Sequence, residues 1–368
     1  MYESPISKTY DAMDNYGDVV FGSSAADSLD LIHPSPVNIF RLWQTFLDNV
    51  NSLIKIFHAP SMQQQLLEAT SNLDQVPKNL EALMFGIYSM AAASIAEADC
   101  EKLFDEDKLV MLRRYQSGAR KALQNAGYLR STDFVVLQAF VLLLVSYLSG
   151  PFCSLEKPIT IDNRRQLSSF QMTDDPRSLF CLSGIAVRMG QRMGLATDGT
   201  HYGLLPFEAE MRRRLWWQIV LIDTRLSEIS GSGPGFLSYT WNTKLPLNFN
   251  DSDLFPDMRA SPIERSGLTE ISFFRLRCEI ADFIQKSKDS RSTIQTATLH
   301  KAIDEFEQRI EREYLSYCDP SIPLHFMSIS MVRSAFCKLR IGRRHFQIAA
   351  NRDINVSQAE KDELFILR

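Results

Sequence analysis

Apolar residues recur at intervals of three and four along most of this chain, and that spacing predicts α-helices. The clearest example is the stretch from 212 to 223, where Leu215, Ile219 and Ile222 fall on one helical face. No stretch alternates convincingly between apolar and polar residues, so the pattern predicts an all-α fold of about ten helices. The other helices are expected over 37–50, 61–67, 78–98, 101–126, 133–148, 177–193, 266–287, 292–317 and 326–350.

Glycine and proline mark where these helices are expected to begin and end. Pro36 suits the first turn of the first helix, and Ser61 suits the cap of the second. Gly150 and Pro151 are expected to break the apolar helix before them, and Gly194 to end another helix in the left-handed conformation.

The pattern also predicts how the chain is divided. Residues 1–33 are rich in Ser, Asp and Gly with little periodicity, which favours a flexible leader. One large helical domain is expected over 34–350, packed as an irregular bundle or as solenoid-like helix pairs, and 351–368 form a C-terminal tail. A long irregular loop, 230–262, begins at a Gly-rich break. A loop of that length is usually functional or ordered by burial.

Composition narrows the class of protein. The chain is 45% hydrophobic and 23% charged with a net charge of −4, which is typical of a globular protein. Such a balance is unfavourable for free-standing DNA binding, because neutralising phosphates needs clustered Lys and Arg. Residues 1–30 show no secretory signal pattern. The most apolar run, 134–148, is too short to span a bilayer, so no membrane association is predicted.

The cysteines and histidines do not have the spacing of a metal site. The six cysteines lie far apart in the sequence, and no two histidines stand four residues apart. Zinc ribbons and helical metal motifs need close ligand pairs. No metal and no other cofactor is therefore predicted for this chain.

Three arginines, Arg212, Arg213 and Arg214, stand directly before the pair Trp216 and Trp217 in the predicted helix. Cations in the first turn oppose the helix dipole, so acidic partners are expected nearby. Glu208 and Glu210 are candidates just upstream. The favoured interpretation is a core helix with paired charges, and the alternative is an anion-binding or interface face.

Acid–base chemistry has a few candidate residues. Asp223 and Glu228 lie near the Gly-rich break, and His201 lies in the loop before the arginine helix. A perturbed acid or base in a pocket is what an enzyme would need. Salt bridges of Asp223 and Glu228 to Arg212, Arg213 or Arg225 are the simpler expectation. Asp251 and Asp253 are expected to cap a turn, with calcium binding as the weaker alternative.

A basic face on the helix 326–350 is the candidate interaction surface. Arg340, Arg343 and Arg344 contribute to it. A solvated face is the usual explanation of such a charge pattern, and contact with a partner is the alternative.

Several of these stretches resemble the regulatory middle region of fungal zinc-cluster transcription factors. The most recognisable string is Arg212-Arg213-Arg214-Leu215-Trp216-Trp217, with Asp223 six residues beyond the second Trp and a Gly-Pro shortly after. The resemblance covers roughly 34–285. Its other stretches are 37–51 (VNIFRLWQTFLDNVN), 80–88 (LEALMFGIY), 182–200 (LSGIAVRMGQRMGLATDGT) and 245–254 (LPLNFNDSDL).

The chain departs from the family pattern in two places. Ser52 stands where relatives usually have Pro, and 1–33 contain no cysteine, whereas family members carry a basic six-cysteine zinc cluster ahead of this region. Three interpretations stay open: a partial chain, a regulator that works through a partner, or a domain recruited to another task. Zinc would be a cofactor only if such a cluster lies upstream.

The resemblance implies an all-helical regulatory domain that controls transcription in the nucleus, with the cytoplasm as the alternative location. It implies contact with DNA only indirectly or through a missing N-terminal module. A homodimer or a transcriptional partner, and a small apolar ligand, are the expected binding partners. The ligand pocket would be lined by Trp216, Trp217, Phe236 and Trp241, with plain core packing as the alternative. The competing functions are an enzyme of fungal secondary metabolism and an interaction or scaffold protein.

Overall fold

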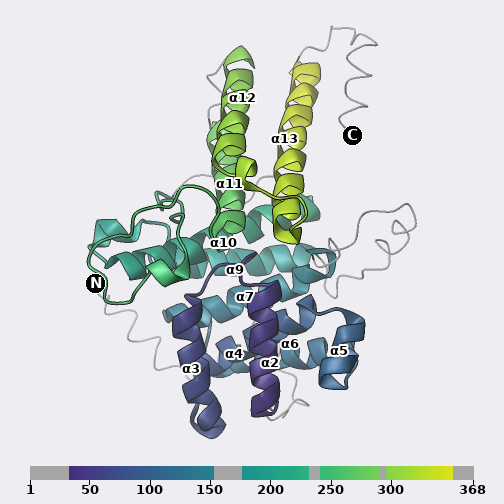
Figure 1. The fold of residues 1–368 in the computed structure, drawn as a ribbon, viewed down its shortest axis with the longest axis vertical. Helices are drawn as coiled ribbons and strands as arrows, with labels where there is room; N and C mark the ends of the chain where they lie inside the picture. Colours follow the sequence, from purple (N-terminus) through teal and green to yellow (C-terminus); the bar gives the residue numbers. More distant parts are fainter. Residues whose placement is uncertain (1–32, 153–175, 232–240, 290–295, 351–368) are drawn as a thin grey trace. The chain divides into compact units, whose positions relative to one another are not determined.

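The structure is a computed structural model that describes residues 33–152, 176–231, 241–289 and 296–350 (Figure 1). These residues form eleven α-helices, short 3₁₀ helices and no strand, which confirms the all-α prediction. They divide into two compact units. The first unit lies within Met1–Asn51, Ile56–Asp198 and Gln218–Thr243, and the second within Ser52–Lys55, Gly199–Trp217 and Lys244–Arg368.

The first unit is built around a single buried helix, α4 (Lys78–Ser94), which packs against α2, α6 and α7. All its residues from Ala82 to Ala93 are buried. A helix that is apolar all round needs neighbours on every side. Those neighbours and the remaining helices of the unit are α2 (Pro36–Asn49), α3 (Ala59–Ser71), α5 (Glu97–Phe104), α6 (Lys108–Asn125), α7 (Phe134–Phe152), α9 (Pro176–Arg192) and the second part of α10 (Pro206–Ser230).

Small residues let these helices approach closely. At Gly86 an added Cβ would lie 3.3 Å from the Cβ of Leu142 on α7. At Gly118 of α6 it would lie 2.5 Å from the ring of Phe85 on α4. A side chain at Gly86 would therefore push α4 away from α7, and a side chain at Gly118 would push α6 away from α4.

The second unit contains the first part of α10, an irregular segment from 244 to 271, and three longer helices. The irregular segment includes the short 3₁₀ helix η4 (Asp251–Asp253). The other elements of the second unit are η3 (Gly199–Tyr202), α11 (Ser272–Asp289), α12 (Thr296–Glu313), η6 (Leu315–Tyr317) and α13 (Pro323–Ala350).

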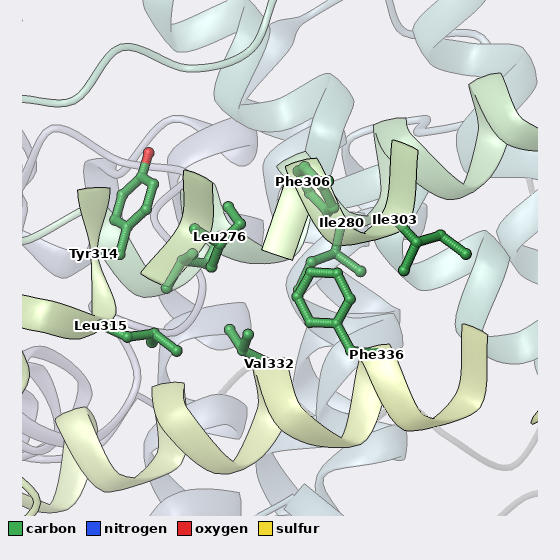
Figure 2. Packing of buried hydrophobic residues seen from close by; sticks show 9 residues of the cluster. Leu276, Ile280, Ile303, Phe306, Tyr314, Leu315, Val332 and Phe336 are labelled. Carbon is green, nitrogen blue, oxygen red and sulfur yellow. The ribbon is translucent and has the colours of Figure 1, made fainter. Parts of the chain in front are cut away.

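Figure 2 shows the core of the second unit, where apolar side chains of α11, α12, η6 and α13 meet. The rings of Phe283 and Phe306 stack with centroids 4.2 Å apart, and Phe336 of α13 lies 5.5 Å from Phe306. Burial of aromatic area and the ring geometry both stabilise this contact. The buried members are Leu276, Ile280, Ile303, Phe306, Ile310, Tyr314, Leu315, Val332 and Phe336.

A buried carboxylate adds polar contacts between α11 and α12. Glu279 accepts a hydrogen bond from the Tyr314 hydroxyl at 2.6 Å and pairs with Arg275 at 3.1 Å and Arg309 at 2.8 Å. Burial raises the pKa of Tyr314 well above its ordinary value. The hydroxyl therefore stays protonated and donates to the carboxylate.

Several predicted boundaries are confirmed. Pro36 occupies the first turn of α2, and the Ser35 hydroxyl accepts a hydrogen bond from the backbone N–H of Asn38. Gly194 adopts a φ of +74°, the left-handed conformation expected after α9. The predicted leader and tail lie outside the described residues.

Other boundaries are wrong. The single helix expected over 101–126 is two helices, because Asp105 has a φ of +54° and Asp107 caps α6 through the N–H of Val110. A left-handed residue ends a helix, and a carboxylate that binds free N–H groups begins one. The helix α3 starts at Ala59 rather than after Ser61, because Pro60 suits the first turn.

Two further boundaries differ from expectation. The apolar helix α7 continues through Gly150 and Pro151 to Phe152 instead of ending before them. The helix α11 begins at Ser272 rather than 266, since the preceding residues are held in the irregular segment by Asn248. Among the described residues, no helix is long and apolar enough to cross a membrane.

The close approach of α4 and α6 gives a first prediction. We expect Gly118→Ala to lower the free energy of unfolding by about 1–3 kcal/mol, because overpacking forces buried neighbours to move. Phe85 cannot swing away easily, since it is 2% exposed and packed beside the rings of His33 and Tyr88 at 4.8 and 5.5 Å. Chemical denaturation followed by circular dichroism measures the change.

The matched control is Gly184→Ala on α9, where an added Cβ meets nothing within 4 Å. Alanine there restricts the unfolded chain and should stabilise by about 0.4–1 kcal/mol. Equal effects of the two substitutions would show that the contact with Phe85 is not the reason.

Candidate functional site

The string Arg212-Arg213-Arg214-Leu215-Trp216-Trp217, which we call the Arg-Trp motif, lies on α10. The two units share this helix. Residues up to Trp217 belong to the second unit and those from Gln218 to the first. Pro206 begins the helix, where its fixed φ and missing N–H are tolerated. The arginines of the motif then follow within the first turns, together with the two carboxylates expected upstream.

Those carboxylates pair with all three arginines along the helix. Arg212 lies 4.0 Å from Glu208, and Glu210 lies 3.7 Å from Arg213 and 3.1 Å from Arg214. Such pairs three and four residues apart face each other on a helix. Because α10 begins at Pro206, the arginines lie beyond its first turn, and the expectation that they form the first turn against the helix dipole is wrong.

Arg214 is also part of a larger network that we call the buried charge cluster: Lys55, Glu210, Arg213, Arg214, Asp251 and Glu270. The Arg214 guanidinium donates to Asp251 Oδ1 at 2.9 Å, and the Lys55 ammonium lies 2.9 Å from Asp251 Oδ2. Lys55 also lies 2.8 Å from Glu270. Within this network three cations face three carboxylates.

Most of the buried charge cluster is shielded from water. The side chains of Lys55 and Arg214 are 0% exposed, whereas the Glu270 side chain is 46% exposed and forms the solvent-facing edge. Burial raises the pKa of Glu210, and the nearby Arg214 and Arg213 act against that shift. Buried charges are tolerated only when partners surround them. This arrangement favours paired structural charges over an anion-binding face.

The buried charge cluster and its neighbours fix the irregular segment. Trp217 donates from its indole Nε1 to the backbone oxygen of Lys244 at 2.8 Å. The buried Asn248 donates to the backbone oxygens of Arg265 at 2.8 Å and Gly267 at 2.9 Å, and accepts from Thr269 at 2.8 Å. These polar contacts order the segment.

Asp251 and Asp253 have different roles. Asp253 caps η4 by accepting from the backbone N–H of Asn250, as predicted, and it also pairs with Arg265 at 2.6 Å. Asp251 instead belongs to the buried charge cluster, a role that its turn-like sequence did not reveal. No group of three or more metal-ligating side chains occurs among the described residues.

Asp223, six residues beyond Trp217, lies in the first unit and is 2% exposed. Its Oδ1 is 2.8 Å from the Ser183 hydroxyl, which is also 2.8 Å from the backbone oxygen of Phe180. The predicted salt bridge of Asp223 to an arginine is therefore wrong. Glu228, in contrast, pairs with Arg225 at 3.2 Å on the surface.

The hydrogen bond between Ser183 and Asp223 bears on whether the Asp223 carboxyl is protonated. A hydroxyl has one proton and cannot donate to both oxygen atoms. When Ser183 donates to Phe180, Asp223 has to supply the other proton. Burial raises the pKa of Asp223, and its Oδ2 has no hydrogen-bond partner among the described residues. These facts favour a neutral Asp223 over a wider pH range than usual.

The remaining candidate residues are dispersed. Trp216 and Trp217 are buried in the second unit, and Trp241 is half-buried in the first. Phe236 lies outside the described residues, so the ligand pocket stays a prediction. His201 is exposed in η3.

The predicted basic face of α13 is only partly described. Arg340 pairs with Asp304 at 3.2 Å and with Glu307, both on α12. Its charge is therefore engaged within the second unit. The side chains of Arg343 and Arg344 lie outside the described residues, and an interaction role for them stays a prediction.

Comparison with known proteins identifies the class. Residues 167–328 match the fungal specific transcription factor domain. The matched range contains the Arg-Trp motif, Asp223 and the irregular segment. The chain therefore carries the regulatory domain of fungal transcription factors, as the sequence motifs predicted. No solved structure matches the chain.

Individual relatives support the same class over most of the chain. Transcriptional regulator AacuB of Aspergillus aculeatus is 34% identical over 95% of this chain and 46% of its own length. Aurofusarin cluster transcription factor aurR2 of Gibberella zeae is 36% identical over 93% and 48%. Pyriculol/pyriculariol biosynthesis cluster transcription factor 1 of Pyricularia oryzae is 36% identical over 88% and 43%. The chain thus spans about half the length of these relatives.

The buried charge cluster gives a second prediction. We expect Arg214→Met to lower the free energy of unfolding by about 3–5 kcal/mol, because it removes one of the two cations beside each of the buried carboxylates Glu210 and Asp251. Denaturant titration followed by tryptophan fluorescence measures the loss. The matched control is Arg225→Met, whose exposed pair with Glu228 contributes about 0–1 kcal/mol. Similar stabilities for the two variants would contradict a structural role of the cluster.

The buried carboxyl of Asp223 gives a third prediction. Because its pKa in the folded protein lies above the ordinary value of 3.8, its contribution to stability is largest at low pH and falls as the pH rises. Asn cannot titrate. The stability of Asp223→Asn relative to the unchanged protein should therefore increase as the pH rises above about 4. Denaturation curves at several pH values measure this trend.

The control for this trend is Asp253→Asn, because the pKa of Asp253 is shifted in the opposite direction to that of Asp223. The hydrogen bond from Arg265 lowers the pKa of Asp253, so this carboxylate stabilises the fold at neutral pH and loses that effect in acid. The relative stability of Asp253→Asn should therefore decrease as the pH rises. Parallel trends for the two variants would refute the assignment for Asp223.

Proposed function

We propose that this chain is the regulatory region of a transcription regulator that controls a set of fungal genes for secondary-metabolite biosynthesis. The observation that carries the proposal is the similarity over about nine-tenths of the chain to two named cluster regulators. The factor aurR2 is named for the aurofusarin cluster, and the Pyricularia oryzae factor is named for a pyriculol/pyriculariol biosynthesis cluster. The family domain match over 167–328 supports the regulatory role.

The structure is consistent with a regulatory body rather than a DNA reader. The arginines of the Arg-Trp motif are paired with carboxylates instead of facing solvent as a basic stripe. The net charge of −4 does not favour phosphate binding. We therefore propose that the region acts in the nucleus and reaches DNA through another protein or another segment.

Control of this region by a small apolar ligand or a partner protein belongs to the same proposal. The family resemblance supports it. Among the predicted lining residues, Trp241 is half-buried and can be reached, whereas Trp216 and Trp217 are buried.

Gene deletion in the fungus that encodes this chain tests the proposal. Transcripts of a co-located group of biosynthetic genes should fall in the deletion strain and return on complementation with the unchanged gene. RNA sequencing of the two strains measures this. A complementing gene with Asp223→Asn should also restore them, because that carboxyl has no chemical role in a regulator.

The enzyme alternative predicts the opposite pattern. Transcripts would stay unchanged in the deletion strain while a metabolite is lost, and Asp223→Asn or Glu228→Gln would fail to restore that metabolite. Arg225→Met is the matched surface control and should restore both readouts. Unchanged transcripts with a lost product would overturn the proposed function.

A further inference from the structure

Two Ser-Pro dipeptides occur among the described residues, Ser35-Pro36 and Ser261-Pro262. Ser-Pro is the dipeptide that proline-directed protein kinases modify. Such a kinase has to bind its substrate segment as accessible, extended backbone, which folded elements do not provide. The two serines share this local sequence, so the surrounding structure decides which one a kinase can reach.

Ser35 is part of the start of a helix. Its backbone oxygen accepts from the N–H of Ile39 at 2.9 Å, and its hydroxyl accepts from the N–H of Asn38 at 3.4 Å. A kinase would have to unwind the first turn of α2 to bind this segment. The N-cap geometry therefore protects Ser35 in the folded protein.

Ser261 lies in a very different environment. Leu254 is fully buried and Gly267 is buried, but every residue from 255 to 266 is exposed or half-exposed, with Ile263 at 92%. In the described structure, residues 259–264 make no backbone–backbone hydrogen bond, and the Ser261 hydroxyl has no hydrogen-bond partner. This hexapeptide can present its backbone to an external binding groove without breaking a backbone–backbone hydrogen bond.

The base of this exposed segment is held firmly. The Arg265 guanidinium donates to Asp253 at 2.7 and 2.6 Å, and its backbone N–H donates to the oxygen of Asn248 at 2.8 Å. Glu264 pairs with Arg275 of α11 at 2.9 Å. These contacts fix the end of the loop, so the segment can be bound while the rest of the unit stays folded.

We propose that Ser261 is a phosphorylation site for a proline-directed serine/threonine kinase. In this reaction the Ser261 hydroxyl oxygen bonds to the γ-phosphorus of ATP, and the bond from that phosphorus to the bridging oxygen breaks. ADP leaves, and the hydroxyl proton passes to the kinase's base.

The modification changes the charge of the segment. Arg259 and Glu264 cancel in the unmodified hexapeptide 259–264, and phosphoserine adds a charge of about −1.5 to −2. This charge appears two residues from the exposed Ile263, where it opposes burial of that side chain against an apolar partner surface. Phosphorylation is thus a means to control contacts made by this loop.

Kinase treatment of the purified full chain tests the proposal. A variant with Ser4→Ala and Ser35→Ala leaves Ser261-Pro262 as the one Ser-Pro dipeptide of the chain. With a purified proline-directed kinase and magnesium ATP, this variant should incorporate phosphate that peptide mass spectrometry assigns to Ser261. Adding either Ser261→Ala or Pro262→Ala should abolish that incorporation, and the circular dichroism spectrum should not change.

Two results would overturn the proposal. One is phosphate on Ser261 only after thermal unfolding of the chain, which would show that the folded loop is not accessible. The other is an unmodified Ser261 in the chain isolated from growing fungal cells under every culture condition in which the protein is present. Phosphate on Ser261 in both the purified chain and the cells would support it. These outcomes do not depend on the transcript measurements above.

Discussion

The ion pairs of Asp251 with Arg214 and Lys55 are the contacts on which the second unit depends most. They take a carboxylate from the irregular segment and surround it with two fully buried cations. A buried carboxylate without those cations would carry a large desolvation penalty. The two cations are balanced in turn, because Glu210 pairs with Arg214 and Glu270 pairs with Lys55.

The Arg-Trp motif thereby has a physical explanation. Arginines near a helix N-terminus and tryptophans one turn later look contradictory if each is judged by propensity alone. In the structure the guanidinium groups meet carboxylates, while Trp217 uses its indole N–H to hold the backbone at Lys244. Charge pairing and aromatic burial thus attach the same irregular segment to one helix.

The all-α class and most helices could be predicted from the sequence because apolar spacing reports directly on buried helical faces. The partners Glu208 and Glu210 could also be predicted, since they lie on the same helix as the arginines. Asp251 could not be assigned to Arg214, because 37 residues separate them and nothing local marks the contact. The break at Asp105 could not be predicted either, because a single left-handed residue leaves the apolar spacing on both sides unchanged.

The segment Ser52–Lys55 belongs to the second unit although the chain on both sides of it belongs to the first. The Lys55 ammonium binds Glu270, which lies 215 residues later. During synthesis this amine therefore emerges long before its carboxylate partners, and it stays hydrated until they are made. Contacts so distant in sequence slow folding, because closing the long loop between them costs entropy. A fragment that begins after residue 55 would leave Asp251 in its apolar surroundings with one cation instead of two.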